Sequence, residues 1–115
     1  MNYHFSIIVP TVEDWCCIGE APDCTCFHSE GWYDYLRRIH RKPFVVKIMT
    51  DRLAGYFIGA KRWLGITVVE SPATSTGSYT TGLCMLEPIS LEERVNIYQE
   101  LYLWLRKEMH SLPFI

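Results

Sequence analysis

Three apolar runs follow one another between residues 44 and 70, and only two residues separate each run from the next. The runs cover residues 44–50, 53–61 and 64–70 and are rich in Val, Ile, Phe and Tyr, which favour β-strands. Separators this short cannot hold a crossover helix, so neighbouring strands must reverse direction. The sequence therefore predicts an antiparallel strand meander.

Two glycines mark one face of the middle strand. Gly55 and Gly59 are four residues apart, so both lie on the same face of the strand. Without side chains at these positions, a bulky group can approach the backbone closely. We expect a groove here that is filled, most simply, by a packed aromatic ring.

Helical patterns precede and follow the meander. Ser29 can cap a helix over residues 29–40, which has apolar residues at helical spacing, and Pro43 prevents a long continuation. Upstream, residues 3–9 are typical of an opening strand and residues 10–28 of irregular chain. This region therefore predicts one strand and one helix.

The last helix has the clearest signal. After Pro88, Ser90 and Glu93 have the spacing of a capping box, and the helix continues to about residue 110. Ile97 and Trp104 widen its apolar stripe beyond what one sheet face needs, which predicts a second apolar neighbour. The stripe itself consists of Leu91, Val95, Tyr98, Leu101, Tyr102, Leu105 and Met109.

The final residues, 112–115, have the pattern of a strand that has only begun. Exposed strand edges and large apolar patches are features that folded proteins usually cover. We therefore expect the chain to self-associate, or to pair with another polypeptide, through residues 91–115. Alternatively, the chain is a fragment of a longer protein.

Composition places these elements in one domain. The chain has 115 residues, of which 49% are apolar and 21% charged, as expected for a packed core. The fold class predicted is α+β: a single domain over residues 1–115, with an antiparallel strand meander packed against two helices. The net charge of -2 gives no attraction to nucleic acid. Without a membrane span or a secretory signal, the expected location is cytoplasmic.

Five cysteines are an odd number, which argues against a disulfide framework and for reduced thiols. The alternative is a zinc site formed by Cys16 or Cys17 with Cys24, Cys26 and His28. Structural zinc sites usually leave two to four residues between paired ligands, whereas these pairs leave one or none. We therefore expect no metal.

A polar loop over residues 71–82 interrupts the apolar strands and is the longest one in the chain. Its hydroxyls and backbone amides are expected at one edge of the sheet, where a ligand could be received. Candidates for a general base are His28, Glu70 and Glu87, but none has a neighbouring partner in the sequence that marks it. The catalytic residues are therefore unknown at this stage.

Four segments of the chain carry a resemblance to a known family. They are Phe27-His28-Ser29-Glu30-Gly31-Trp32, the 44–61 hairpin with Gly55-Tyr56-Phe57-Ile58-Gly59, Glu70-Ser71-Pro72 and Tyr79-Thr80-Thr81-Gly82. These segments resemble the N-terminal half of Fem-like acyltransferases of the GNAT superfamily. That resemblance implies a GNAT-like half-domain that shapes the acceptor cleft, while a second GNAT-like half holds the acyl donor. It implies N-acetyl or aminoacyl transfer in a complete protein, acyl-CoA as that protein's cofactor, and an amine or other small-molecule acceptor. The loop residues implied in acceptor binding are Ser71, Tyr79, Thr80, Thr81 and Gly82.

The chain departs from this family at the donor site. A GNAT acyl-CoA site needs a strand and then a Gly-rich turn whose amides meet the pyrophosphate at a helix N-terminus. No Q/R-x-x-G-x-G/A pattern occurs here, and Pro88 and Ser90 already occupy the start of the last helix. We therefore expect no cofactor to be bound by this chain alone and no catalysis by it alone. The alternative is a non-enzymatic interaction module that completes its sheet with a partner chain.

Overall fold

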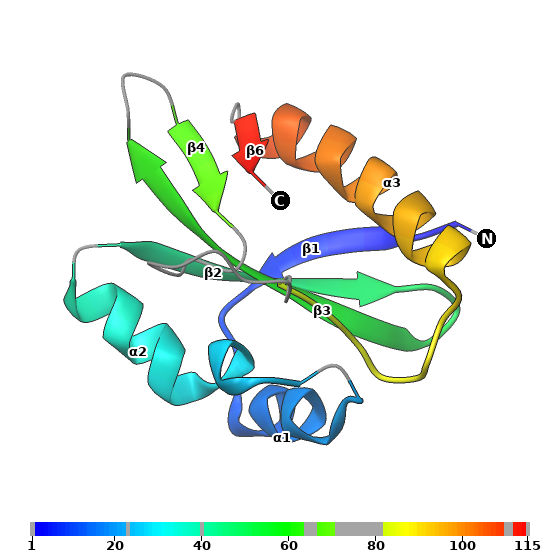
Figure 1. The fold of residues 1–115 in the computed structure, drawn as a ribbon, viewed down its shortest axis with the longest axis horizontal. Coiled ribbons are helices and arrows are strands. Elements are labelled where there is room, and N and C mark those ends of the chain that lie inside the picture. The colour runs from blue at the N-terminus through cyan, green and yellow to red at the C-terminus, as the bar shows by residue number, and fades with distance from the viewer. Residues whose placement is uncertain are drawn as a thin grey trace.

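The computed structural model describes residues 2–22, 24–39, 41–63, 67–70, 82–109 and 112–114. Helices and strands combine in an α+β arrangement, as the sequence predicts (Figure 1). In chain order the elements are β1 (His4–Ile8), α1 (Val12–Glu20), the 3-10 turn η1 (Cys26–His28), α2 (Glu30–Arg38), β2 (Lys42–Met49), β3 (Leu53–Trp63), β4 (Thr67–Glu70), β5 (Leu83–Met85), α3 (Leu91–Met109) and β6 (Leu112–Phe114).

The described strands form one sheet in the order β1-β2-β3-β4-β6, with β5 also paired to β3. The predicted meander is confirmed, because β2, β3 and β4 are successive antiparallel neighbours. A tight turn joins β2 to β3, in which the Thr50 amide donates to the Arg52 carbonyl at 2.8 Å. The sheet is not wholly antiparallel, however, since β6 pairs with β4 in parallel.

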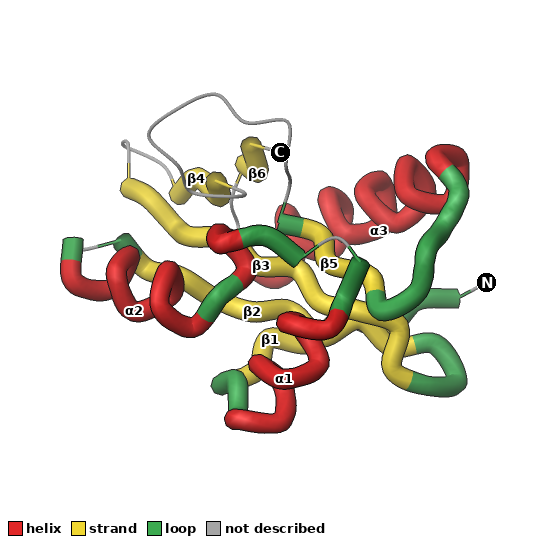
Figure 2. Tube along the Cα trace, turned by 60° about the horizontal axis from the view of Figure 1, so that its bottom comes forward, coloured by secondary structure: helices red, strands yellow, loops and turns green. Residues whose placement is uncertain are grey.

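β4 and β5 lie end to end along the same side of β3, because β2 occupies its other side. Glu70 at the end of β4 pairs with Ala60, and Leu83 at the start of β5 pairs with Phe57. Figure 2 shows β5 beside β3. The sequence did not predict β5, because a three-residue strand directly after a polar loop gives almost no alternating pattern.

β5 also fills the space above Gly55. A Cβ atom at this position would meet the Cys84 carbonyl oxygen at 2.7 Å and the Met85 sulfur at 2.8 Å. The predicted close approach is therefore present at Gly55, but the group that approaches is a neighbouring strand and not an aromatic ring.

Helices cover both faces of the sheet: α3 lies on one, and α1 and α2 lie on the other (Figure 1). Side chains alternate along β3, so Phe57 packs with the α3 side and Tyr56 and Ile58 pack with the α1 side. The prediction of two helices is therefore wrong, because the described part of the chain has three.

The additional helix, α1, lies in the segment that was expected to be irregular. Thr11 and Asp14 form its capping box: the Asp14 amide donates to Thr11 Oγ1 at 3.3 Å, and the Thr11 amide donates to Asp14 Oδ2 at 2.9 Å. Ile18 is fully buried against the sheet. α1 has only nine residues and Asp in place of the usual Glu or Gln of the box, so its pattern is weak.

The two predicted helices are confirmed together with their caps. Ser29 Oγ accepts from the Trp32 amide at 3.1 Å at the start of α2. Ser90 Oγ accepts from the Glu93 amide at 3.1 Å at the start of α3. These hydroxyls satisfy amides that have no partner within the first turn of a helix.

The buried stripe of α3 differs from the predicted one. Ile97, Leu101 and Leu105 are fully buried against the sheet, whereas Leu91 and Val95 are exposed. Trp104 packs against Phe5 of β1, with 5.7 Å between the ring centroids. Because β1 belongs to the same sheet, Trp104 packs on the sheet itself and does not mark a second apolar neighbour.

The predicted terminal strand is present as β6. It lies at one edge of the described sheet, beside β4. α3 is thus the crossover helix that a parallel strand pair requires. The sequence predicted the strand but not its partner, because the pairing joins residues more than forty positions apart.

Candidate functional site at the start of helix α3

Most of the predicted acceptor site lies outside the described residues. This holds for Ser71, Tyr79, Thr80 and Thr81. Gly82 is described: it is buried, and its carbonyl accepts from the Ile58 amide at 2.9 Å. Gly82 therefore extends the pairing of β5 with β3, and its carbonyl is engaged by the sheet.

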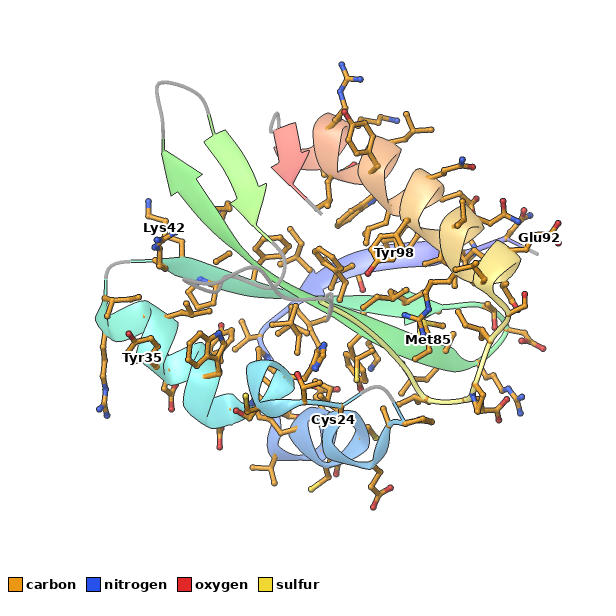
Figure 3. The ribbon with its side chains drawn as sticks, in the orientation of Figure 1. Cys24, Tyr35, Lys42, Met85, Glu92 and Tyr98 are labelled. Atoms are coloured by element: carbon orange, nitrogen blue, oxygen red, sulfur yellow. The ribbon has the colours of Figure 1, made fainter. Side chains whose placement is uncertain are left out.

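A cavity of about 620 Å³ opens where the sheet meets the start of α3. Its walls come from the 50–52 turn, the first residues of β3, the 85–89 segment, Tyr3 and Glu93. Figure 3 labels Met85 on β5, which lines this cavity, and Glu92 in the first turn of α3. The volume lies in the range of small-molecule sites, about 300–1,000 Å³.

Tyr3 joins the N-terminal segment to α3 at the cavity wall. Its hydroxyl donates to Glu93 Oε1 at 2.8 Å. Burial, together with the hydrogen bond to Glu93 and the charges of Glu93 and Glu100, raises the pKa of Tyr3 to about 12. The phenol is therefore a neutral donor at physiological pH, held by a charged acceptor.

The charges that line the cavity are mostly negative. Three are carboxylates, from Asp51, Glu87 and Glu93, and one is the guanidinium of Arg52. Arg52 Nη2 lies 3.6 Å from Glu87 Oε1, and both side chains are largely exposed, so water screens this pair strongly. Two more carboxylates than cations therefore face the cavity.

The start of α3 does not suit the pyrophosphate of an acyl-CoA. Ser90 Oγ already accepts from the Glu93 amide, and Pro88 has no amide hydrogen to donate. The first turn also carries Glu92 and Glu93, which would repel a phosphate. The residues present here therefore do not fit this cofactor.

His28 is buried and has a structural role. Its Nδ1 accepts from the Thr25 amide at 2.9 Å and lies 2.9 Å from Thr25 Oγ1, which fixes the turn before α2. It does not line the cavity. Glu70 lies in β4, where its backbone pairs with Ala60. Of the three predicted bases, Glu87 is the one that faces the cavity.

A second polar cluster lies on the α1 side of the sheet. The Tyr56 hydroxyl donates to Asp14 Oδ1 at 2.8 Å, and both residues are buried. Burial opposes the charge of Asp14, but hydrogen bonds from Thr11 and Tyr56 outweigh it and hold the pKa of Asp14 below its ordinary value. Burial, followed by the bond to Asp14, raises the pKa of Tyr56. The Thr11-x-x-Asp14 spacing is a local signal for the cap of α1, but the bond of Asp14 to Tyr56 joins residues 42 positions apart and was not predicted.

The cysteines remain thiols. Burial raises the pKa of the Cys24 thiol, which donates to the Thr25 carbonyl at 3.7 Å. The Cys84 thiol is buried and donates to the Ile18 carbonyl at 3.7 Å. Within the described residues, no group of three His, Cys, Asp or Glu side chains could hold a metal ion.

Protein-family models, curated proteins and solved structures give no match to this chain. The likeness to Fem-like acyltransferases therefore rests on the four segments quoted above and stays a prediction. In the described part of the chain, no helix has both the length and the apolar character needed to cross a bilayer.

Proposed function

We propose that this chain is the acceptor-side domain of an N-acyltransferase-like protein, similar to the Fem-like members of the GNAT superfamily. It binds the amine that receives the acyl group, and it does not bind the acyl donor. The observation that carries the proposal is the acidic cavity between the 50–52 turn and the start of α3.

The negative charge of this cavity favours binding of an amine acceptor over binding of an acyl-CoA donor. A primary or secondary amine is an ammonium ion at neutral pH, and it is attracted by the carboxylates of Asp51, Glu87 and Glu93. The pyrophosphate of an acyl-CoA is repelled by the same groups. Each exposed pair contributes less than about 1 kcal/mol, so the three carboxylates supply less than about 3 kcal/mol, and an amine held mainly by these charges binds with a Kd of about 10 mM or weaker.

The order of elements around the cavity supports a GNAT-like origin. β5 is followed by the 86–90 segment and then by α3, which is the strand-turn-helix order of a GNAT donor site. The turn has Glu87 and Pro88 and no glycine. The segment therefore has the element order of a donor site but lacks the groups that would bind the donor.

The predicted acceptor loop ends near this cavity along the chain. Its last residue, Gly82, bonds to Ile58 of β3. Gly82 lies three residues before Met85 in the cavity wall, roughly 10 Å at about 3.3 Å per residue. We propose that the cavity and the 71–82 loop belong to one acceptor site.

Titration with amines tests the proposal. Nuclear magnetic resonance shifts of Met85 and Ile89 are expected to move with glucosamine, lysine methyl ester or spermidine, but not with neutral N-acetylated analogues. Glu87→Gln is expected to weaken amine binding several-fold, because it removes one of the three carboxylates. Glu13→Gln is the matched control, since Glu13 is exposed on α1 at the opposite face of the sheet.

Two results would contradict the proposal. One is the absence of shifts at the cavity with every amine up to tens of millimolar. The other is calorimetric binding of acetyl-CoA with a Kd below about 10 μM, roughly 7 kcal/mol of binding free energy.

The second candidate function is a non-enzymatic interaction module. It is supported by the position of β6, which is at the edge of the described sheet and could accept a strand from a partner. The amine titration separates the two candidates, because a module of this kind needs no ligand in the cavity.

A further inference from the structure

The outward side of α3 is apolar although it faces away from the sheet. Val95, Tyr98, Gln99, Tyr102 and Leu103 surround a shallow groove of about 530 Å³, which we name the outer face of α3. Val95 is 45% exposed and Leu103 is 64% exposed. Aliphatic side chains grouped like this on a surface mark a site of contact with another molecule more often than scattered ones do.

The outer face is distinct from the face of α3 that builds the core. The core face consists of Ile97, Leu101 and Leu105, which are fully buried. The outer residues follow a different register: Glu92, Val95, Gln99, Tyr102 and Arg106 are spaced by three or four residues in alternation. This spacing forms a continuous seam along a helix, as at the contact between two packed helices.

Two pairs of residues on the outer face and its ends are placed symmetrically about Gln99. Val95 and Leu103 lie four residues before and after it, and Glu92 and Arg106 lie seven residues before and after it. Two copies of α3 that pack antiparallel about a two-fold axis at Gln99 would place Val95 of each copy against Leu103 of the other. They would also place Glu92 of each copy against Arg106 of the other. The outer face is thus complementary to itself, as a two-fold interface requires.

The charges of α3 favour the antiparallel arrangement over the parallel one. The first turn carries Glu92 and Glu93, and the last turn carries Arg106 and Lys107. In an antiparallel pair, the acidic end of one helix meets the basic end of the other, whereas a parallel pair would bring like charges together. Arg106 already lies over the Tyr102 ring, 5.8 Å from its centroid, at the edge of the seam.

We infer that a second copy of this chain binds the outer face of α3, with the two α3 helices antiparallel and Gln99 on the two-fold axis. This inference does not depend on the proposed acyltransferase-like function. It also changes the position of the expected contact, because Trp104 packs against β1 and takes no part in it.

Charge reversal tests this geometry directly. Glu92→Arg alone places two arginines together at both ends of the seam, and Arg106→Glu alone places two glutamates together. Each variant is expected to be monomeric in sedimentation velocity at concentrations where the wild-type chain is dimeric. A mixture of the two variants restores both pairs and is expected to form a heterodimer, and the double variant is expected to form a homodimer. Arg38→Glu, on α2 at the other face of the sheet, is the control and leaves dimerisation unchanged.

Leu103→Glu tests the apolar centre of the same contact. The residue is exposed, so the variant is expected to keep the circular dichroism spectrum of the wild type and to shift the dimerisation constant at least tenfold toward monomer. A wild-type chain that remains monomeric at several hundred micromolar would overturn the inference. It would also be overturned if Glu92→Arg and Arg106→Glu each dimerised as tightly as the wild type, because that result indicates a parallel pair or a different contact.

Discussion

Two tyrosine–carboxylate hydrogen bonds join distant parts of the chain, one on each side of the sheet, and they differ in burial and in the other partners of the carboxylate. Tyr56 donates to Asp14 and Tyr3 donates to Glu93, both at 2.8 Å. Tyr56 is 1% exposed and Asp14 is 9% exposed, and Thr11 makes further hydrogen bonds to the same carboxylate. Tyr3 and Glu93 are only half-buried and line a cavity.

The difference between the pairs decides which of the two carboxylates can bind a ligand. A buried carboxylate whose oxygens are both occupied has no capacity left for a ligand, and breaking its bonds costs stability. A carboxylate at the wall of an open cavity can exchange partners at little cost. The Asp14–Tyr56 pair therefore fixes α1 on the sheet, whereas the Tyr3–Glu93 pair positions a carboxylate where a cation can reach it.

The largest expected effect comes from breaking the buried pair. Asp14→Ala removes the carboxylate half of the α1 capping box and leaves the Tyr56 hydroxyl buried without this acceptor, which we expect to lower the free energy of unfolding by about 2–4 kcal/mol. Urea denaturation measures the change. Glu13→Ala, in the same turn but exposed, is the control and is expected to change stability by less than about 0.5 kcal/mol. An equal loss in both variants would show that the interaction of first-turn carboxylates with the helix dipole, and not the buried pair, is responsible.

The stability at acid pH tests the buried Asp14–Tyr56 pair in a second way. The pKa of Asp14 is lower in the folded protein than in the unfolded chain, where it is about 3.9. The stability that Asp14 contributes is therefore fully present above that value and is lost as the pH falls through its lower folded pKa. We expect Asp14→Asn to lose less stability than the wild type between pH 5 and 2, measured from urea midpoints. Parallel pH profiles for the two proteins would contradict this assignment.

The buried and half-buried pairs also differ in how readily sequence reveals them. Asp14 lies three residues from Thr11, so its local cap could be recognised, although Tyr56 as its partner could not. Tyr3 and Glu93 are 90 residues apart and have no signal in one sequence. Of the cavity residues, Glu87 alone was a candidate from sequence, as a possible base.

The same division between local and distant interactions holds for the fold. The meander, α2 and α3 were predictable because strand-forming runs and the caps at Ser29 and Ser90 are local signals. The position of β5 against β3 and the parallel pairing of β6 with β4 depend on contacts between distant residues. The sequence signal for α1 was local, but the helix is short. Burial of Ile18 rather than intrinsic propensity stabilises it.

The ionisation of Tyr3 at alkaline pH tests the half-buried Tyr3–Glu93 pair. Because the pKa of Tyr3 is raised to about 12, its contribution to stability is fully present below the unfolded value of about 10 and is lost as the pH rises from there toward 12. The difference in absorbance at 295 nm between the wild type and Tyr3→Phe is expected to show one phenol that ionises near pH 12. Glu93→Gln is expected to lower that midpoint, because it removes the charged acceptor. A Tyr3 midpoint near 10 in the wild type would show that the hydrogen bond is absent in solution.

The smallest effect on stability, and the most informative one for the cavity, is expected at Arg52. Its pair with Glu87 is largely exposed, so Arg52→Ala should change the free energy of unfolding by less than about 0.5 kcal/mol. The same change removes the only cation that lines the cavity within the described structure and releases Glu87 to bind a ligand. Amine affinity should therefore increase about two- to fivefold, an electrostatic gain of less than about 1 kcal/mol, and this gain should shrink as salt is added. Weaker amine binding in Arg52→Ala would contradict the proposal that the negative charge of the cavity attracts the amine.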